Sequence, residues 1–300
     1  MLLGSQRINE HGHLEIGGCD TLDLVHQFGT PLYVMDESAI RDACRRYRAA
    51  FESRYQRNVI HYAGKAFLCL AMCRIIEQEG LGLDVAALGE LHTAIEAGFP
   101  MSRVNLHGNN KSREELELAV RHRVGHITID NEREIETLED VLSSDARHPA
   151  QDVLIRCAPG GDPLTHRFMR TGQADTKFGF NIADGSAIRA VDRVLRSSRL
   201  RYKGLHFHVG SQLTDAESHV GAIETAVDLM SAIRRKHGAE SEILNIGGGL
   251  GVRYLADQPT LSLEHFAEAI VSTLTNRLRD AGLPDPILAQ EPGRAIVGEA

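Results

Sequence analysis

The sequence predicts an α/β protein folded as a (β/α)8 barrel, a TIM-type barrel. Between residues 59 and 292, eight strand-like runs alternate with seven segments of helical periodicity. Such alternation implies parallel strands connected by crossover helices, and eight units of this length suit a barrel. The competing architecture is a doubly wound open sheet, which usually places a Gly-rich nucleotide-binding turn after its first strand. Here the first strand ends at Lys65 instead, so we prefer the barrel.

Composition and charge limit the classes of function. The chain has 300 residues, 42% of them hydrophobic, which allows one large domain or two small ones with a full core. A formal net charge of -8 argues against a nucleic-acid or anionic-membrane partner. No apolar run approaches the roughly 20 residues that span a bilayer, and no secretory signal opens the sequence. The five cysteines show no CxxC or zinc spacing, so we expect a cytoplasmic protein.

An N-terminal part precedes the alternating pattern. Residues 1–24 are polar and glycine-rich without a strong period. Residues 30–36 (TPLYVMD) predict a strand, and residues 37–54 predict an amphipathic helix. We assign residues 1–35 to an N-terminal segment and residues 36–300 to the barrel domain.

The barrel units follow in regular order. The strands are expected at residues 59–66, 82–87, 104–109, 126–131, 152–159, 202–210, 242–249 and 286–292. The helices are expected at residues 69–80, 88–98, 112–123, 132–143, 183–197, 215–237 and 261–282. No helix follows the eighth strand before Ala300, so we expect the face of strands eight and one to lie uncovered.

Polar side chains recur at the ends of the predicted strands. In a barrel the carboxyl ends of all strands converge on one face, where active sites are built. Those ends carry Lys65, Asp84, His107, Asn109, Asp130, Arg156, His206, His208, the glycines 247–249 and Glu291. Scattered surface polarity would not repeat at one structural position, so the pattern predicts an active site on this face.

Lys65 closes the first strand. A lysine on a buried strand is costly unless it is paired, solvated or used, and its pKa falls readily on burial, which suits Schiff-base chemistry. Taken alone, a strand-end lysine more often extends to water. Its position in a barrel that also carries a glycine loop favours the chemical role.

Two loops after later strands complete the pattern. Residues 247–251 (GGGLG) offer backbone N–H groups for a phosphate, and barrels commonly bind phosphate after strands seven and eight. The run is neither a Walker A loop nor GxGxxG, and a tight turn would explain it equally well. After strand eight, Glu291 and Arg294 are either a surface ion pair or one group for a cofactor and one for a substrate anion.

His206 and His208 alternate on one strand and therefore share a face. With His107 they could provide a zinc site geometrically, although no zinc motif matches, and we expect no metal. The alternative is an imidazole lying flat on an aromatic cofactor. A lysine, a glycine loop, a histidine and a carboxylate together fit pyridoxal 5'-phosphate, an electron sink that the protein orients.

Eight segments, in family order, resemble the fold-type III pyridoxal phosphate-dependent decarboxylases. They are residues 62–67 (YAGKAF), 82–85 (GLDV), 89–91 (GEL), 107–112 (HGNNKS), 171–180 (TGQADTKFGF), 204–212 (GLHFHVGSQ), 247–251 (GGGLG) and 291–294 (EPGR). HGNNKS and TGQADTKFGF indicate the branch of the family that acts on diaminopimelate rather than ornithine.

The resemblance implies roles for individual residues. Lys65 would be the Schiff-base lysine, His208 would stack on the pyridine ring, and Glu291 would hold the ring nitrogen protonated; these three are the expected catalytic residues. Arg294 would also meet a substrate carboxylate. Further cofactor contacts are expected from Ser211, Gly247, Gly248, Gly249, Pro292 and Gly293, with support from Asp84, Glu90 and Arg156.

The implied reaction is decarboxylation of meso-2,6-diaminopimelate, a small amino acid, to L-lysine and CO2 in lysine biosynthesis. A carboxylate at the ring nitrogen maximises electron withdrawal, whereas racemases of similar fold place an arginine there. Glu291 therefore favours decarboxylation over racemisation. The alternatives are a decarboxylase of another diamino acid and a non-catalytic pyridoxal phosphate-binding homologue. The short carriers of that second kind lack the segments at 107–112 and 171–180.

The chain departs from the family pattern at three places. Residues 164–166 (LTH) stand where the family usually has His-Thr-His, and residues 86–88 (AAL) replace Ser-Gly-Gly. Family members also continue into a C-terminal β-barrel domain that carries the proton donor and completes a partner subunit's site. That domain is absent from this sequence, and residues 1–35 resemble the segment that supplies its first strand. We therefore expect a fragment of an enzyme that is a homodimer when complete.

Overall fold

Eight parallel strands close into a barrel in the computed structural model, which describes residues 2, 4–144, 148–160, 178–255 and 257–300. The strands are β4 (Asn58–Ala63), β5 (Gly82–Val85), β6 (Val104–Leu106), β7 (His126–Ile129), β8 (Gln151–Ala158), β10 (Leu200–His206), β11 (Ile243–Asn245) and β12 (Ile287–Gln290). They pair in this order, and β12 pairs with β4 to close the ring. A two-residue strand, β9 (Phe180–Asn181), pairs with β8 outside the ring. The predicted barrel is confirmed.

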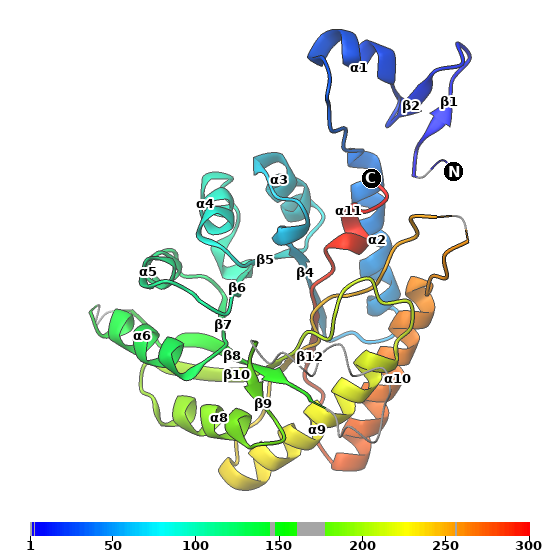
Figure 1. Cartoon of the computed structure of the whole chain (residues 1–300). Coiled ribbons are helices and arrows are strands. Elements are labelled where there is room, and N and C mark those ends of the chain that lie inside the picture. Colours follow the sequence, from blue (N-terminus) through cyan, green and yellow to red (C-terminus); the bar gives the residue numbers. More distant parts are fainter. Residues whose placement is uncertain (1, 3, 145–147, 161–177, 256) are drawn as a thin grey trace.

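Helices surround the barrel on its outer face (Figure 1). They are α3 (Leu70–Gln78), α4 (Leu88–Glu96), α5 (Arg113–His122), α6 (Glu132–Ser143), α8 (Ser186–Arg196), α9 (Glu217–His237) and α10 (Leu263–Ala281), with a short α11 (Arg294–Val297) after β12. One-turn 3-10 helices lie at Gly64–Ala66 and Met101–Arg103. Each predicted helix is present, and none is shorter than predicted by more than a few residues.

Local sequence signals fix these helices. Ser112 and Glu115 form a reciprocal capping box at the start of α5, and the Asn131 side chain caps α6. At the other ends, Gly238 and Gly282 adopt left-handed conformations after α9 and α10. The strands are short apolar runs because both faces of a barrel strand are buried.

The helix α2 (Glu37–Glu52) precedes the first barrel strand and completes the outer ring. It lies between α10 and α3 beside β4 (Figure 1). The Phe51 ring is buried, stacked on Tyr47 at 5.4 Å between ring centroids and edge-on to Phe266 of α10 at 6.2 Å. The expectation of an uncovered face beside strands eight and one is therefore wrong. The helix before strand one covers the place that a helix after strand eight would take.

The N-terminal segment differs from the prediction. Residues 30–36 form no strand; they run as an extended link in which Tyr33 is 99% exposed, although their composition suits a strand. Upstream, residues without a clear period form an antiparallel sheet of β1 (Arg7–Ile8), β2 (Leu14–Ile16) and β3 (Cys19–Asp20), followed by α1 (Thr21–Phe28). No described strand lies beside residues 30–36 to pair with them, and strand propensity without a partner does not form a sheet.

The small sheet and α1 of this segment stand beyond one end of α2 (Figure 1). A hydrogen bond from the Ser5 hydroxyl to the Asp36 carboxylate ties it to the start of α2, and Ser5 Oγ accepts from the Gly17 N–H at 2.7 Å. The boundary at residue 35 stays a prediction.

Some sequence features fall outside the described residues. Residues 164–166 and most of the motif at 171–180 belong to this group. None of the described helices combines the length and the apolar character that crossing a bilayer requires.

We predict that Phe51→Ala lowers the free energy of unfolding by about 3–5 kcal/mol, because it empties a buried aromatic site between α2 and α10. Urea denaturation followed by circular dichroism measures this. Arg46→Ala, on an exposed position of the same helix, is the control and should stay within about 0.5 kcal/mol of the parent. Equal stability of the two variants would contradict the role of α2 in closing the ring.

Candidate active site

A cavity of about 180 Å³ opens at the carboxyl ends of β4, β10, β11 and β12. Its lining includes nine of the thirteen residues expected to bind or support the cofactor: Lys65, His208, Ser211, Gly248, Gly249, Glu291, Pro292, Gly293 and Arg294. Ala63, Ala66 and Leu250 complete it. These residues come from four separate stretches of the chain, and the barrel brings them together.

The remaining expected residues do not line this cavity. Gly247 holds the base of the loop: its N–H donates to Asn245 Oδ1 at 2.9 Å, and its carbonyl accepts from the Glu291 N–H at 2.9 Å. Asp84 is buried, with Oδ1 3.7 Å from His107 Nε2. Arg156 lies 3.5 Å from the Asp130 carboxylate, with its guanidinium over the Phe178 ring.

Glu90 does not line the cavity. Its carboxylate accepts the Ala86 N–H at 2.6 Å and so holds the turn between β5 and α4.

The strand before Lys65 ends earlier than expected. The strand β4 stops at Ala63, and Lys65 sits in the following 3-10 turn, where its side chain is exposed at the cavity. Lys65 therefore follows the buried strand, and its side chain is solvated at the cavity, which is one of the alternatives that the sequence left open. Hydrogen bonds fix the turn on both sides, from the Ala63 N–H to the Pro292 carbonyl at 3.0 Å and from the Tyr62 hydroxyl to the Phe67 carbonyl at 2.7 Å.

The glycine loop after β11 packs too closely for side chains. A Cβ at Gly248 would lie 2.1 Å from the Glu291 carbonyl oxygen, and one at Gly249, where φ is 131°, would lie 2.7 Å from the Gly210 carbonyl oxygen. From below, His219 Nε2 donates to the Gly248 carbonyl at 3.2 Å. The loop can thus present its backbone to a ligand at very short range.

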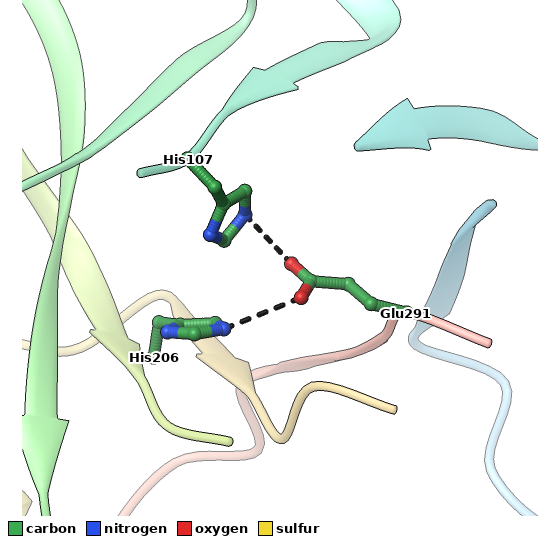
Figure 2. A group of neighbouring side chains, drawn as sticks. All are labelled: His107, His206 and Glu291. Carbon is green, nitrogen blue, oxygen red and sulfur yellow. Dashed lines mark hydrogen bonds and ion pairs between the residues drawn. The ribbon is translucent and has the colours of Figure 1, made fainter. Parts of the chain in front are cut away.

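Glu291 directly follows β12 and is 4% exposed. Its Oε1 atom lies 2.8 Å from His107 Nε2 and accepts from Asn245 Nδ2 at 2.6 Å. Its Oε2 atom lies 3.3 Å from His206 Nε2. Figure 2 shows the two imidazoles directed at the carboxylate from β6 and β10. Donors from the ends of β6, β10 and β11, strands from different sides of the barrel, therefore meet at this one carboxylate.

These contacts shift the pKa values of the group. Burial would raise the pKa of Glu291, but His107 and His206 outweigh it and hold that pKa well below its usual value. Burial would lower the pKa of His107, but Asp84 and Glu291 raise it. Burial lowers the pKa of His206 and of His208 to about 3, and it raises the pKa of Asp84 to about 6. Glu291 is ionised at neutral pH, whereas His206 and His208 are neutral.

The side chains of His107, His206 and Glu291 also form the one group among the described residues that could hold a metal ion. His107, His206 and Glu291 place possible ligand atoms within 4.8 Å of one another, so the third member is Glu291 rather than His208. We interpret the group as a hydrogen-bonded carboxylate. Glu291 already accepts from three donors, and the raised pKa of His107 favours the protonated ring, while a metal needs the neutral one.

Sequence reasoning missed two partners of the site. Asn245 bridges Glu291 and the glycine loop. It is a polar residue at the end of β11, two positions before Gly247, and this position could have indicated a side chain directed at the site. Tyr254 accepts a hydrogen bond from Arg294, whose other terminal nitrogen lies 3.5 Å from Ser211 Oγ. Tyr254 gave no signal, because its loop lies far along the chain from both partners.

The residues fit pyridoxal phosphate chemically. The closely packed glycine backbone suits a phosphate, the ionised Glu291 suits a protonated ring nitrogen, and the neutral His208 imidazole, against Gly247, suits an aromatic ring face. Lys65 supplies a primary amine at the cavity.

Comparisons with known proteins agree on one family. The sequence model described as "Pyridoxal-dependent decarboxylase, pyridoxal binding domain" matches residues 37–298. The diaminopimelate decarboxylase of Bacillus subtilis is 44% identical over 299 residues, which are 100% of this chain and 68% of that protein. The enzyme of the same name from Bacillus methanolicus is 37% identical over 297 residues, 99% of this chain and 68% of its own length.

Solved structures give the same answer. The diaminopimelate decarboxylase of M. jannaschii in complex with L-lysine superimposes with a TM-score of 0.92 at 31% identity, covering 99% of this chain and 68% of that one. The chain thus spans about two thirds of the length of these relatives.

We predict that Gly248→Ala destabilises the protein by about 1–3 kcal/mol, because the new methyl group collides with the backbone of Glu291. Gly89→Ala is the matched control: nothing lies within 4 Å of its Cβ, and it sits in a helix, so that variant should be neutral or slightly stabilised. Thermal unfolding of the two variants measures the difference. A Gly248→Ala protein as stable as Gly89→Ala would show that the loop does not pack as described.

Proposed function

Since the chain belongs to the pyridoxal-dependent decarboxylases and, within them, to the diaminopimelate decarboxylases, we propose that it binds pyridoxal 5'-phosphate and that the protein containing it converts meso-2,6-diaminopimelate to L-lysine and CO2. The observation that carries the proposal is the single cavity that unites Lys65, the glycine loop and the ionised Glu291. The name of the relatives and the L-lysine complex of one of them support the substrate class.

Each side chain would hold a different part of the cofactor. Lys65 would bond covalently to it, and His208 would pack on its ring. The N–H groups of Gly248 and Gly249, in the loop that Gly247 anchors, would bind its phosphate together with Ser211. When bound, the cofactor withdraws electrons from the substrate and so stabilises the carbanion that loss of CO2 leaves. The protein contributes orientation and charge at fixed positions, which needs no rearrangement during the reaction.

Glu291 decides the class of reaction in this proposal. A carboxylate that stays ionised in a buried site keeps a ring nitrogen beside it protonated, because an opposite charge at close range stabilises the protonated form. The strongest electron withdrawal follows, which favours decarboxylation over racemisation.

Arg294 would bind a carboxylate of the substrate. Its guanidinium reaches the cavity between Tyr254 and Ser211, and guanidinium pairs well with carboxylates. The part of the relatives that this chain does not match would supply the proton donor, in a cytoplasmic homodimer. All five cysteines are free thiols, which fits a reducing compartment.

We predict that borohydride treatment in the presence of pyridoxal phosphate attaches the cofactor to the peptide that contains Lys65. The exposed amine at the cavity is the reason. Mass spectrometry of the digest identifies the modified peptide, and Lys65→Ala should lose the label. Lys111 serves as the internal control, since its amine is buried in an ion pair with Glu134. A label on Lys111 or Lys177 in place of Lys65 refutes the assignment.

We predict that the protein containing this chain releases CO2 from meso-2,6-diaminopimelate in preference to ornithine, and that Glu291→Ala lowers kcat by about 10²–10³ with a smaller effect on KM. A radiometric CO2 assay measures both. Glu240→Ala is the control, because Glu240 is exposed and precedes the amino end of β11, away from the site; this variant should have the kcat of the parent. Cofactor binding without any turnover would instead identify a non-catalytic homologue, and preference for ornithine would refute the substrate.

A further inference from the structure

We propose that His107 is a positioning residue that carries a positive charge and serves as the resident counter-ion of Glu291, so that the carboxylate is ionised and oriented before any cofactor arrives. This inference rests on the proposed function, because it concerns the carboxylate proposed to face the cofactor's ring nitrogen. It assigns a purpose to the segment 107–112 (HGNNKS), of which the proposed chemistry makes no use.

The first argument is the occupancy of the Glu291 carboxylate. A carboxylate has about four lone-pair positions. His107 and Asn245 occupy two on Oε1, and His206 occupies one on Oε2. One position on Oε2 is therefore left for a ligand. A buried carboxylate with so few exposed atoms also needs a positive partner, since its burial is otherwise very costly.

The second argument concerns which histidine carries the charge. His107 Nε2 lies between two carboxylates, 2.8 Å from Glu291 on β12 and 3.7 Å from Asp84 on β5. Asp84 is 2% exposed, and its Oδ1 atom has no hydrogen-bond partner among the described residues. Among the described residues, Glu291 is the one carboxylate that forms an ion pair with His206, and the His206 Nδ1 atom has no partner there.

The other groups that face His107 fit this assignment. Thr128 of β7 lies 3.4 Å from Nε2 and is uncharged, and the His206 ring is edge-on at 4.7 Å between ring centroids. Arg156 of β8 is an opposing charge, and it lowers the pKa of His107 less than the two carboxylates raise it. A proton on this cluster at neutral pH therefore resides on His107.

The third argument is the anchor at the other end of the segment. Lys111 Nζ is buried and lies 2.7 Å from Glu134 Oε1 of α6, 2.6 Å from the Thr128 carbonyl and 2.8 Å from the Gly108 carbonyl. The Ser112 side chain then caps α5. The loop is thus fixed four residues after His107, and this holds the imidazole at the end of β6. The segment thus carries two charged side chains with different partners: His107 pairs with Glu291 in the site, and Lys111 pairs with Glu134 on α6.

The consequence for the site is a charge that does not depend on the ligand. Without His107, an empty site would leave Glu291 with only neutral donors, and burial would drive it to take up a proton. With His107 the carboxylate stays ionised, so it can receive a protonated ring nitrogen without first losing a proton of its own.

The test measures the protonation of His107 directly in cofactor-free protein. Histidine-labelled protein is titrated by NMR, and His107→Gln and His206→Gln assign the two signals. We expect His107 to be an imidazolium at pH 7 and His206 to be neutral. In Glu291→Gln the pKa of His107 should fall by at least ~1 unit, a tenfold loss of proton affinity. In His206→Gln it should change little, since that partner is neutral.

A second measurement follows the stability of the cofactor-free protein with pH. The pKa of His107 is raised on folding, so its pair with Glu291 stabilises fully below about pH 6.5 and is lost as the pH rises through the folded pKa. The stability deficit of His107→Gln against the parent should therefore shrink above that pH, while titrations shared by both proteins cancel. A His107 that is neutral at pH 7, or that ignores Glu291→Gln, overturns the inference. Labelling of Lys65 tests the proposed function separately.

Discussion

The buried carboxylate of Glu291 is the constraint on which the site depends. A charge with 4% exposure persists only where donors converge on it, and here they come from β6, β10 and β11. Asn245 extends the same network to the glycine loop through the Gly247 N–H. The carboxylate, the phosphate-type loop and the imidazoles are therefore one connected structure, and a shift in any of the three strands moves the others.

Closure of the barrel is what makes that convergence possible. Strand β12 pairs with β4, which places the turn of Lys65 directly against the Glu291–Gly293 turn, with the Ala63 N–H donating to the Pro292 carbonyl. The helix α2 covers this junction from outside, with Tyr55 just beyond it bonded to the Pro286 carbonyl at 2.8 Å. The pairing of β12 with β4 that closes the barrel thus also brings the Lys65 amine and the Glu291 carboxylate to the same cavity.

The electrostatics of the cluster follow from its depth. Burial lowers the pKa of both His206 and His208 to about 3, because the negative charge beside each imidazole is too small to offset it. Both side chains are therefore neutral. His107 escapes this because two carboxylates flank it. Histidines at the ends of different strands therefore differ in charge, and the number of carboxylates beside each imidazole sets the difference.

Much of this could be read from the sequence. Period and length placed the barrel strands and helices, and the polar strand ends placed Lys65, His208, the glycines and Glu291 on one face, because parallel strands in a barrel share a direction. Local pattern misplaced residues 30–36, which have strand composition but no partner. It also could not show that α2 closes the ring, that Lys65 is exposed, or that His107 and Asn245 meet Glu291. Several of those facts join residues far apart in the sequence, such as Phe51 with Phe266 and His107 with Glu291, and only closure of the barrel brings such residues into contact.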